Sequence, residues 1–148
     1  MALGLIASLL VAAAPAGTPP NGTIEVAVAG VRNASGQVKV DVCTQATFLK
    51  NCPWTGLAPA HDGTVIVEVH GVPPGRYAIQ AFHDANNNGE CDQGLFGIPR
   101  EGVGFSNDAR ISLGPPKWAD AKFDFNGQLQ TITLKMRYFL GPSGPAAR

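Results

Sequence analysis

The sequence lacks an excess of either charge. Eleven basic and eleven acidic residues balance over 148 positions, and charged residues make up only 15% of the chain. Proteins that bind nucleic acid neutralise its phosphates with clustered Lys and Arg side chains. No such basic stripe occurs here, so the composition predicts no nucleic-acid partner.

Helical periodicity and long apolar runs are also missing. No stretch repeats its apolar residues at helical spacing over three turns, and none reaches the roughly 20 apolar residues of a membrane span. The 18 Gly and 12 Pro residues favour turns instead. An apolar content of 45% is enough for a core. We therefore predict one turn-rich globular domain and no transmembrane helix.

The first sixteen residues carry no charge, and residues 3–14 form an apolar run that ends in small residues at Ala14-Pro15-Ala16. This pattern is typical of a secretory signal peptide, here without the usual basic residues at its start. An apolar N-terminal strand or helix is the alternative. We expect a periplasmic or secreted protein with a signal peptide at 1–16, a linker at 17–22, a domain at 23–140 and a flexible tail at 141–148.

The chain has three cysteines. Cys43 and Cys52 flank a short segment, and in an oxidising compartment we expect them to form a disulfide. Closing so small a loop contributes about 2–3 kcal/mol in the chain-entropy account. Pairing of either one with Cys91 is the alternative.

Alternating apolar residues predict β-strands along much of the chain. The turn residues from Asn33 to Gly36 predict that the first two strands form a hairpin, with Lys39 and Asp41 pointing outward. A short helix or turn is expected at residues 118–121. About seven strands with turns between them predict an all-β fold, an antiparallel β-sandwich of the immunoglobulin-like Greek-key kind. The strand candidates are 23–30, 37–43, 64–70, 76–82, 109–113, 121–125 and 130–140.

A long loop is predicted from His83 to about Asp108, and it begins with oxygen-bearing side chains at every second position. Calcium binds six to eight oxygens, and alternating side chains of a tightly coiled loop can point at one centre. Gly89 stands at the sixth position, where an EF-hand loop turns sharply, but Leu95 replaces the usual twelfth-position glutamate. The candidate calcium ligands are Asp84, Asn86, Asn88, Glu90 through its carbonyl, and Asp92.

This pattern predicts weak calcium binding, with a dissociation constant on the order of 10⁻⁴–10⁻³ M, because few of the ligands are anions. A further oxygen would come from water, Glu101 or Asp108. The alternative is an ion-free turn, since Asn and Asp side chains bond to their own backbone and tolerate left-handed conformations.

Signals for catalysis are sparse. Ser106 lacks the G-x-S-x-G context of a nucleophile elbow, and the histidines and cysteines lack zinc-ligand spacing. We predict no catalytic residue and a protein that is not an enzyme. The alternative is a small extracytoplasmic hydrolase that uses Asp84, Glu101 or His83.

The stretch "PPGRYAIQAFHDANNNGECDQGLFGIPREGVGFSNDA", followed by "GPPKWADAKFDF", resembles an uncharacterised bacterial family, domain of unknown function 2141. The resemblance covers about residues 23–138 and implies an exported protein with a transthyretin-like or collagen-adhesin-repeat-like sandwich. It implies no reaction. The matching pattern falls on His83, Asp84, Asn86, Asn88, Gly89, Asp92, Gly97, Pro99, Glu101, Gly104, Phe105, Ser106 and Asn107.

Together these features predict an exported, non-enzymatic binding or structural module whose loop is the functional surface. The partner expected is a protein, peptide or glycan of unknown identity. The residues predicted to form its binding surface are His83, Glu101, Phe105, Ser106 and Asn107.

Overall fold

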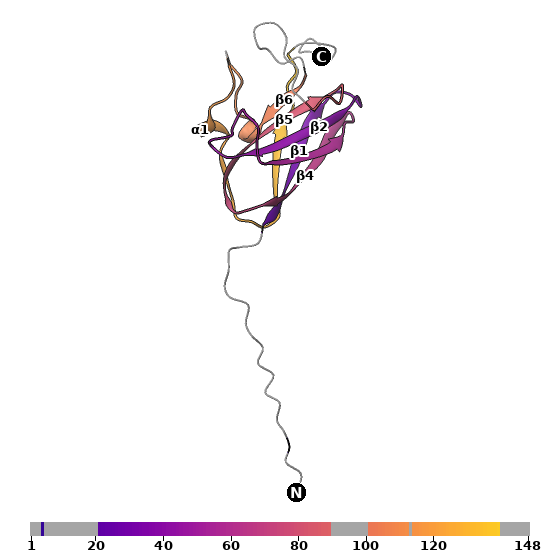
Figure 1. Ribbon diagram of the computed structural model, residues 1–148. Helices are drawn as coiled ribbons and strands as arrows, with labels where there is room; N and C mark the ends of the chain where they lie inside the picture. The colour runs from indigo at the N-terminus through magenta and orange to yellow at the C-terminus, as the bar shows by residue number, and fades with distance from the viewer. Residues whose placement is uncertain (1–3, 5–20, 90–100, 113, 140–148) are drawn as a thin grey trace.

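The computed structural model describes residues 4, 21–89, 101–112 and 114–139, which form two sheets packed face to face (Figure 1). The smaller sheet has the order β4-β1-β8, and the larger has the order β3-β2-β5-β6, with β7 also paired to β5. This confirms the predicted all-β sandwich. The elements are β1 (Gly22–Val31), β2 (Gln37–Cys43), β3 (Trp54–Pro59), β4 (Gly63–Val72), β5 (Gly75–Asp84), β6 (Val103–Phe105), η2 (Ser106–Asp108), α1 (Trp118–Ala121), β7 (Phe123–Phe125) and β8 (Gln130–Lys135).

The predicted hairpin between the first two strands is wrong. β1 pairs with β4 and β8, whereas β2 pairs with β3 and β5 in the other sheet. The turn at residues 33–36 reverses the chain, but it does not decide which strands pair. Val26 and Val40 are both fully buried in the same core. Because β1 and β2 lie in different sheets, their two rows of valines pack against each other, as the inner faces of a sandwich do.

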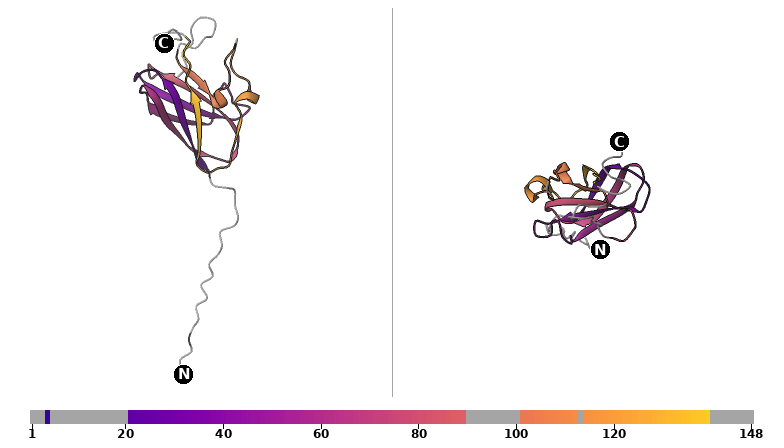
Figure 2. Two further views of the ribbon diagram at one scale, coloured as in Figure 1. Left: turned by 180° about the vertical axis from the view of Figure 1, so that it is seen from behind. Right: turned by 90° about the horizontal axis from the view of Figure 1, so that it is seen from above.

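Strand 5 has an apolar pattern on both faces, and each face has its own core. Tyr77, Ile79 and Ala81 belong to the core between the sheets, as the alternation predicted. Ala78 and Phe82 belong to a second cluster on the outer face of the larger sheet. That cluster is covered by the loop after β2 and by η2 and α1, which Figure 2 shows outside the sheet.

Asp41 points away from the core between the sheets, as predicted, but it is not exposed to solvent. Asp41 is only 5% exposed, because the loop after β2 covers this part of the outer face. Its carboxylate accepts hydrogen bonds from Thr55 Oγ1 at 2.7 Å and from Gln80 Nε2 at 3.2 Å. A buried carboxylate needs such donors, since desolvation otherwise disfavours its charge.

Several other elements differ from the sequence prediction. Residues 109–112 form no strand, while β3 and β6 were not predicted. β8 runs parallel to β1, so the sandwich contains one parallel pair among its antiparallel ones. The short helix α1 was predicted and is present.

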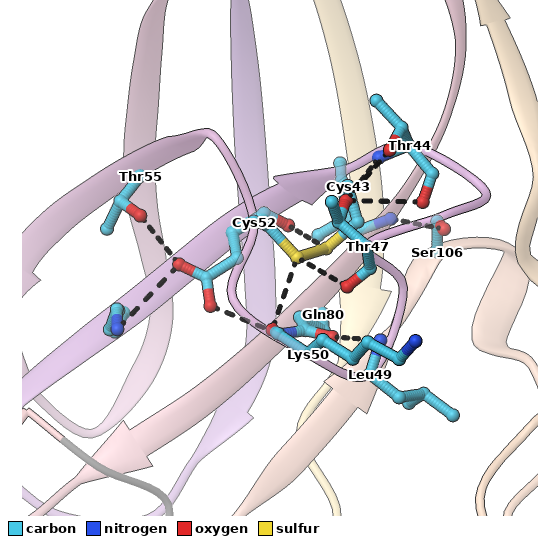
Figure 3. Close-up of a disulfide and its surroundings, with 12 residues drawn as sticks. Cys43, Thr44, Thr47, Leu49, Lys50, Cys52, Thr55, Gln80 and Ser106 are labelled. Atoms are coloured by element: carbon cyan, nitrogen blue, oxygen red, sulfur yellow. Dashed lines mark hydrogen bonds and ion pairs between the residues drawn. A yellow bond between two sulfur atoms is a disulfide. The ribbon is translucent and has the colours of Figure 1, made fainter.

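The predicted disulfide joins Cys43 to Cys52, with 4.8 Å between their Cα atoms (Figure 3). Within the loop that it closes, the Phe48 ring packs edge-on against the rings of Phe105 and Trp118. Gln80 fastens the same loop, because its Oε1 accepts the Leu49 N–H at 2.9 Å. The disulfide therefore fixes the loop after β2, which covers the second cluster.

Some predictions fall on residues that the structure does not describe. These are the signal peptide except for residue 4, the linker up to residue 20, Glu90, Cys91, Asp92 and the tail. Within the described part of the chain, no helix combines the length and apolar character needed to cross a membrane.

Candidate functional site

The candidate site begins where β5 ends, at Asp84. This residue is fully buried, and its carboxylate receives three hydrogen bonds. Gln37 Nε2 donates to Oδ2 at 2.9 Å, the Gly89 N–H donates to Oδ2 at 2.8 Å, and the Asn88 N–H donates to Oδ1 at 3.0 Å. Asp84 thus closes residues 84–89 into a ring and ties that ring to β2.

Two of the predicted calcium ligands come together inside this ring. The Asn88 N–H that contacts Asp84 Oδ1 also contacts Asn86 Oδ1, at 3.3 Å. Both oxygens therefore lie around one point. Asn87 and Gly89 take positive φ angles of 56° and 77°, which tighten the coil. Gly89 makes the sharp turn that its sixth position predicted.

Neighbouring segments hold the outside of the ring. Lys39 Nζ lies 3.3 Å from the Gly89 carbonyl oxygen and 5.2 Å from the centre of the Phe82 ring. Glu101 is 8% exposed, and its Oε1 accepts the Ala85 N–H at 3.1 Å. The roles of Gln37 and Lys39 could not be predicted from the sequence, because only the pairing of β2 with β5 brings them to the loop.

The described part of the loop supplies only some of the oxygens that calcium needs. Among the residues that the structure describes, no three His, Cys, Asp or Glu side chains are grouped so as to hold a metal ion. Glu90 and Asp92, two of the five predicted ligands, lie outside those residues. What the described segment provides is one carboxylate, at Asp84, and amide oxygens.

His83, the residue before Asp84, is 1% exposed and belongs to a buried network. Its Nε2 lies 2.6 Å from the Ser35 carbonyl oxygen, and its Nδ1 lies 2.9 Å from the Tyr138 hydroxyl. That hydroxyl also accepts the Arg32 N–H at 3.1 Å. The imidazole therefore ties the end of β5 to the β1–β2 connection and to the segment after β8.

The two tyrosines of the chain give a pH test of this interior. Burial raises the pKa of both Tyr77 and Tyr138 above the ordinary value of 10.0. The folded protein thus holds these protons more tightly than the unfolded chain, so the contribution of the two tyrosines to stability is constant below about pH 10 and falls as the pH rises further. We expect tyrosinate absorbance to appear only above pH 10, together with unfolding.

A spectrophotometric titration with parallel circular dichroism checks this expectation. In urea, both tyrosines should titrate near pH 10, since the burial is lost. Tyr138→Phe should remove half of the signal and leave Tyr77 ionising late. Half of the tyrosinate signal appearing near pH 10 in a fully folded sample would contradict it.

The predicted binding surface is mostly interior. His83, Glu101, Phe105 and Ser106 are all buried, and only Asn107 is exposed. Of these five residues, Asn107 is therefore the one that a partner can contact at the surface.

The segment from Ser106 to Asp108 makes internal contacts with three elements. Ser106 Oγ accepts the Ile79 N–H of β5, and Asn107 Nδ2 donates to the Lys122 carbonyl oxygen just after α1. Asp108 Oδ1 accepts the N–H of the last residue of β8, at 2.8 Å. Asn107 and Asp108 have positive φ angles of 59° and 47°, conformations that cost energy outside glycine and that these bonds maintain.

A shallow hollow of about 250 Å³ lies beside the loop. Its lining includes Leu57 of the edge strand β3, which is 56% exposed, and Asn87 of the loop. The residues that line the hollow are Gly36, Gln37, Leu57, Ala58, Pro59 and Asn87.

Comparison with known proteins agrees with the resemblance noted in the sequence. The sequence model of domain of unknown function 2141, described as an uncharacterized protein conserved in bacteria, matches residues 26–133. Searches of the curated proteins and of the solved structures found no match. The family match spans well over half of the chain and includes the whole described loop, so the chain belongs to the bacterial family domain of unknown function 2141.

Proposed function

We propose that this protein is an exported, non-enzymatic binding or structural module whose loop from Asp84 to Asp92 holds a calcium ion weakly. The observation that carries the proposal is the contact of Asp84 Oδ1 and Asn86 Oδ1 with a single N–H, that of Asn88. Oxygens at the first and third loop positions thus face one point. A carboxylate or amide oxygen that accepts one hydrogen bond keeps a second lone pair for a cation.

The anchoring of the loop supports the same proposal. Gln37 and Lys39 hold the two ends of the described segment, Asp84 and Gly89, to β2, so this segment is preorganised before an ion binds. Preorganisation lowers the ordering cost of binding. A calcium ion at this place would stiffen the wall of the hollow that Asn87 lines, which gives a partner a fixed surface to contact.

Export is supported by the disulfide, since such bonds persist in oxidising compartments. A non-enzymatic role is supported by the contacts of the side chains that the hydrolase alternative would use. Asp84 and His83 are fully or almost fully buried and bonded within the protein, and Glu101 holds the Ala85 N–H. A general base has to accept a substrate proton, and these groups already take part in hydrogen bonds within the protein.

Calcium should raise the melting temperature. At 10 mM calcium, a dissociation constant near 1 mM stabilises the folded state by about 1.4 kcal/mol through mass action. For a domain of this size, that free energy corresponds to a rise in melting temperature of about 3–8 °C. Differential scanning calorimetry with calcium, with magnesium and with a chelator measures this rise.

Two neighbouring substitutions make a matched pair for this experiment. Asn86→Ala removes a proposed ligand and should abolish most of the calcium-dependent rise. Asn87→Gly changes a residue between two ligands and suits the positive φ at that position, so the rise should persist. If calcium leaves the melting temperature of the wild-type protein unchanged, or if the two variants respond alike, the ion does not bind as proposed.

A further inference from the structure

The chain contains three Asn-Gly steps, at residues 21–22, 88–89 and 126–127. In such a step the backbone nitrogen of glycine can attack the side-chain carbonyl carbon of asparagine. The new C–N bond closes a succinimide, the side-chain nitrogen leaves as ammonia with the proton from the glycine N–H, and water then opens the ring to aspartate or isoaspartate. Water is the only co-reactant. Glycine permits the attack because it has no side chain to hinder it and its backbone is flexible.

The structure places the three steps in different environments. At Asn88–Gly89, the attacking nitrogen is engaged, since the Gly89 N–H donates to the Asp84 carboxylate at 2.8 Å. The Asn88 N–H is held by the same carboxylate at 3.0 Å. A nearby negative charge opposes loss of the N–H proton, and hydrogen bonds to charged groups are among the stronger ones. The Asp84 carboxylate therefore holds the backbone N–H groups of both residues of this step, which protects Asn88 from the reaction.

Asn126–Gly127 lies in the turn between β7 and β8, and Asn126 is exposed. Its Oδ1 accepts the Gln128 N–H at 3.0 Å. This bond draws electron density from the side-chain carbonyl carbon. It also closes a ring that contains both that carbon and the Gly127 nitrogen, so the reacting atoms stay close together. Gly127 has a φ of 85°, a conformation open to glycine at little cost.

The third step is held by the sheet. Gly22 is the first residue of β1 and pairs with Val72 of β4. It also packs tightly on the turn just described, because a Cβ atom at Gly22 would lie 2.1 Å from the Gly127 carbonyl oxygen. The strand pairing and this contact oppose the rotation that ring closure requires.

We infer that Asn126 is a site of spontaneous modification to aspartate and isoaspartate, and that the Asp84 carboxylate protects Asn88 from the same reaction. Modification at Asn126 has a structural consequence. Isoaspartate inserts an extra methylene into the backbone, and the Gly127 carbonyl then loses its close fit on Gly22, where β1 begins. The aged protein should therefore melt at a lower temperature than fresh protein.

Peptide mapping by mass spectrometry tests the inference. The full chain is kept at pH 8.5 and 37 °C in a chelator, so that no cation contributes, and each Asn-Gly step is followed over time. Asn126 should convert at least about tenfold faster than Asn88, the ratio that one hydrogen bond to a charged group supports. In concentrated urea, where Asp84 no longer holds the loop, the two rates should become similar.

The outcomes separate the protection by the fold from the effect of local sequence. Equal rates at Asn88 and Asn126 in the folded chain would overturn the inference, and so would a tenfold ratio that persists in urea. Asp84→Asn should accelerate conversion of Asn88 and leave Asn126 unchanged. Should that variant fail to fold, the comparison in urea still decides. Asn126→Gln should keep its melting temperature during the incubation, while the wild-type protein loses some of its own.

Discussion

Replacing Ser106 by alanine is expected to cost about 2–4 kcal/mol of unfolding free energy. The hydroxyl is fully buried and serves two backbone groups. It accepts the Ile79 N–H at 2.9 Å and donates to the Ala121 carbonyl oxygen at 2.5 Å. Alanine leaves both groups buried without a partner, at about 1–3 kcal/mol each. Urea unfolding monitored by circular dichroism measures the loss.

The position of Ser106 on the edge of β5 explains why the effect should be large. β6 pairs with residues 80–82 of β5, and β7 pairs with residues 75–77. Between these two short strands, the Ser106 hydroxyl takes the place of a strand partner at Ile79. One side chain therefore completes an edge that two separate segments cover only in part.

Ser112→Ala is the matched control, because Ser112 is exposed and lies in the same stretch of chain. It should change stability by no more than about 0.5 kcal/mol, as surface substitutions usually do. A Ser106→Ala protein as stable as the control would show that water or a shifted backbone replaces the hydroxyl. The presence of serine at position 106, within the "FSND" stretch of residues 105–108, would then not be explained by this internal contact.

Strands β1, β2 and β4 could be predicted because each buries an alternating row of apolar side chains. The valines of β1, β2 and β4 show the period of two that half-buried strands require. β3 lacks this signal, since "WTGLAP" has a glycine where the chain passes close to β4, and a Cβ at Gly56 would lie 2.4 Å from the Glu68 carbonyl oxygen. The only sign of such a backbone contact in the sequence is the glycine itself.

The pairing of the strands could not be predicted in the same way. The turn at residues 33–36 has hairpin chemistry, but β1 and β2 separate into different sheets. Burial of both valine rows decides this outcome, and the burial depends on β4, β5 and β8, which lie far along the chain. Local turn residues carry no information about those later strands.

The candidate site shows the same division. The alternating oxygens and the glycine at position 89 predicted a coiled loop, and Asp84, Asn86 and Gly89 do form one. That Gln37 and Lys39 anchor the loop could not be predicted, because they precede it by more than 40 positions. Membership of a long loop predicts that residues 105–107 form a binding surface, yet Ser106, Asn107 and Asp108 all make hydrogen bonds within the protein.

Gly36→Ala should destabilise the protein by about 2–4 kcal/mol and weaken the proposed binding of calcium by the loop. Gly36 has a φ of 69°, and a Cβ atom there would lie 2.0 Å from the Asp84 carbonyl oxygen and 2.7 Å from the Ala85 carbonyl carbon. Both neighbours are backbone, so the start of the loop has to move. Overpacking of this kind costs about 1–3 kcal/mol, and a left-handed alanine adds roughly 1 kcal/mol.

Gly71→Ala separates the two contributions. Gly71 has nearly the same φ, 74°, but nothing lies within 4 Å of its would-be Cβ atom. It should therefore lose only about 1 kcal/mol, from backbone strain alone, and should keep the full calcium-dependent rise in melting temperature. Gly36→Ala should lose more stability and most of that rise, because moving the Asp84 carbonyl shifts the first proposed ligand of the loop. Equal stabilities and equal calcium responses in the two variants would mean that the close contact of Gly36 with Asp84 does not position the loop.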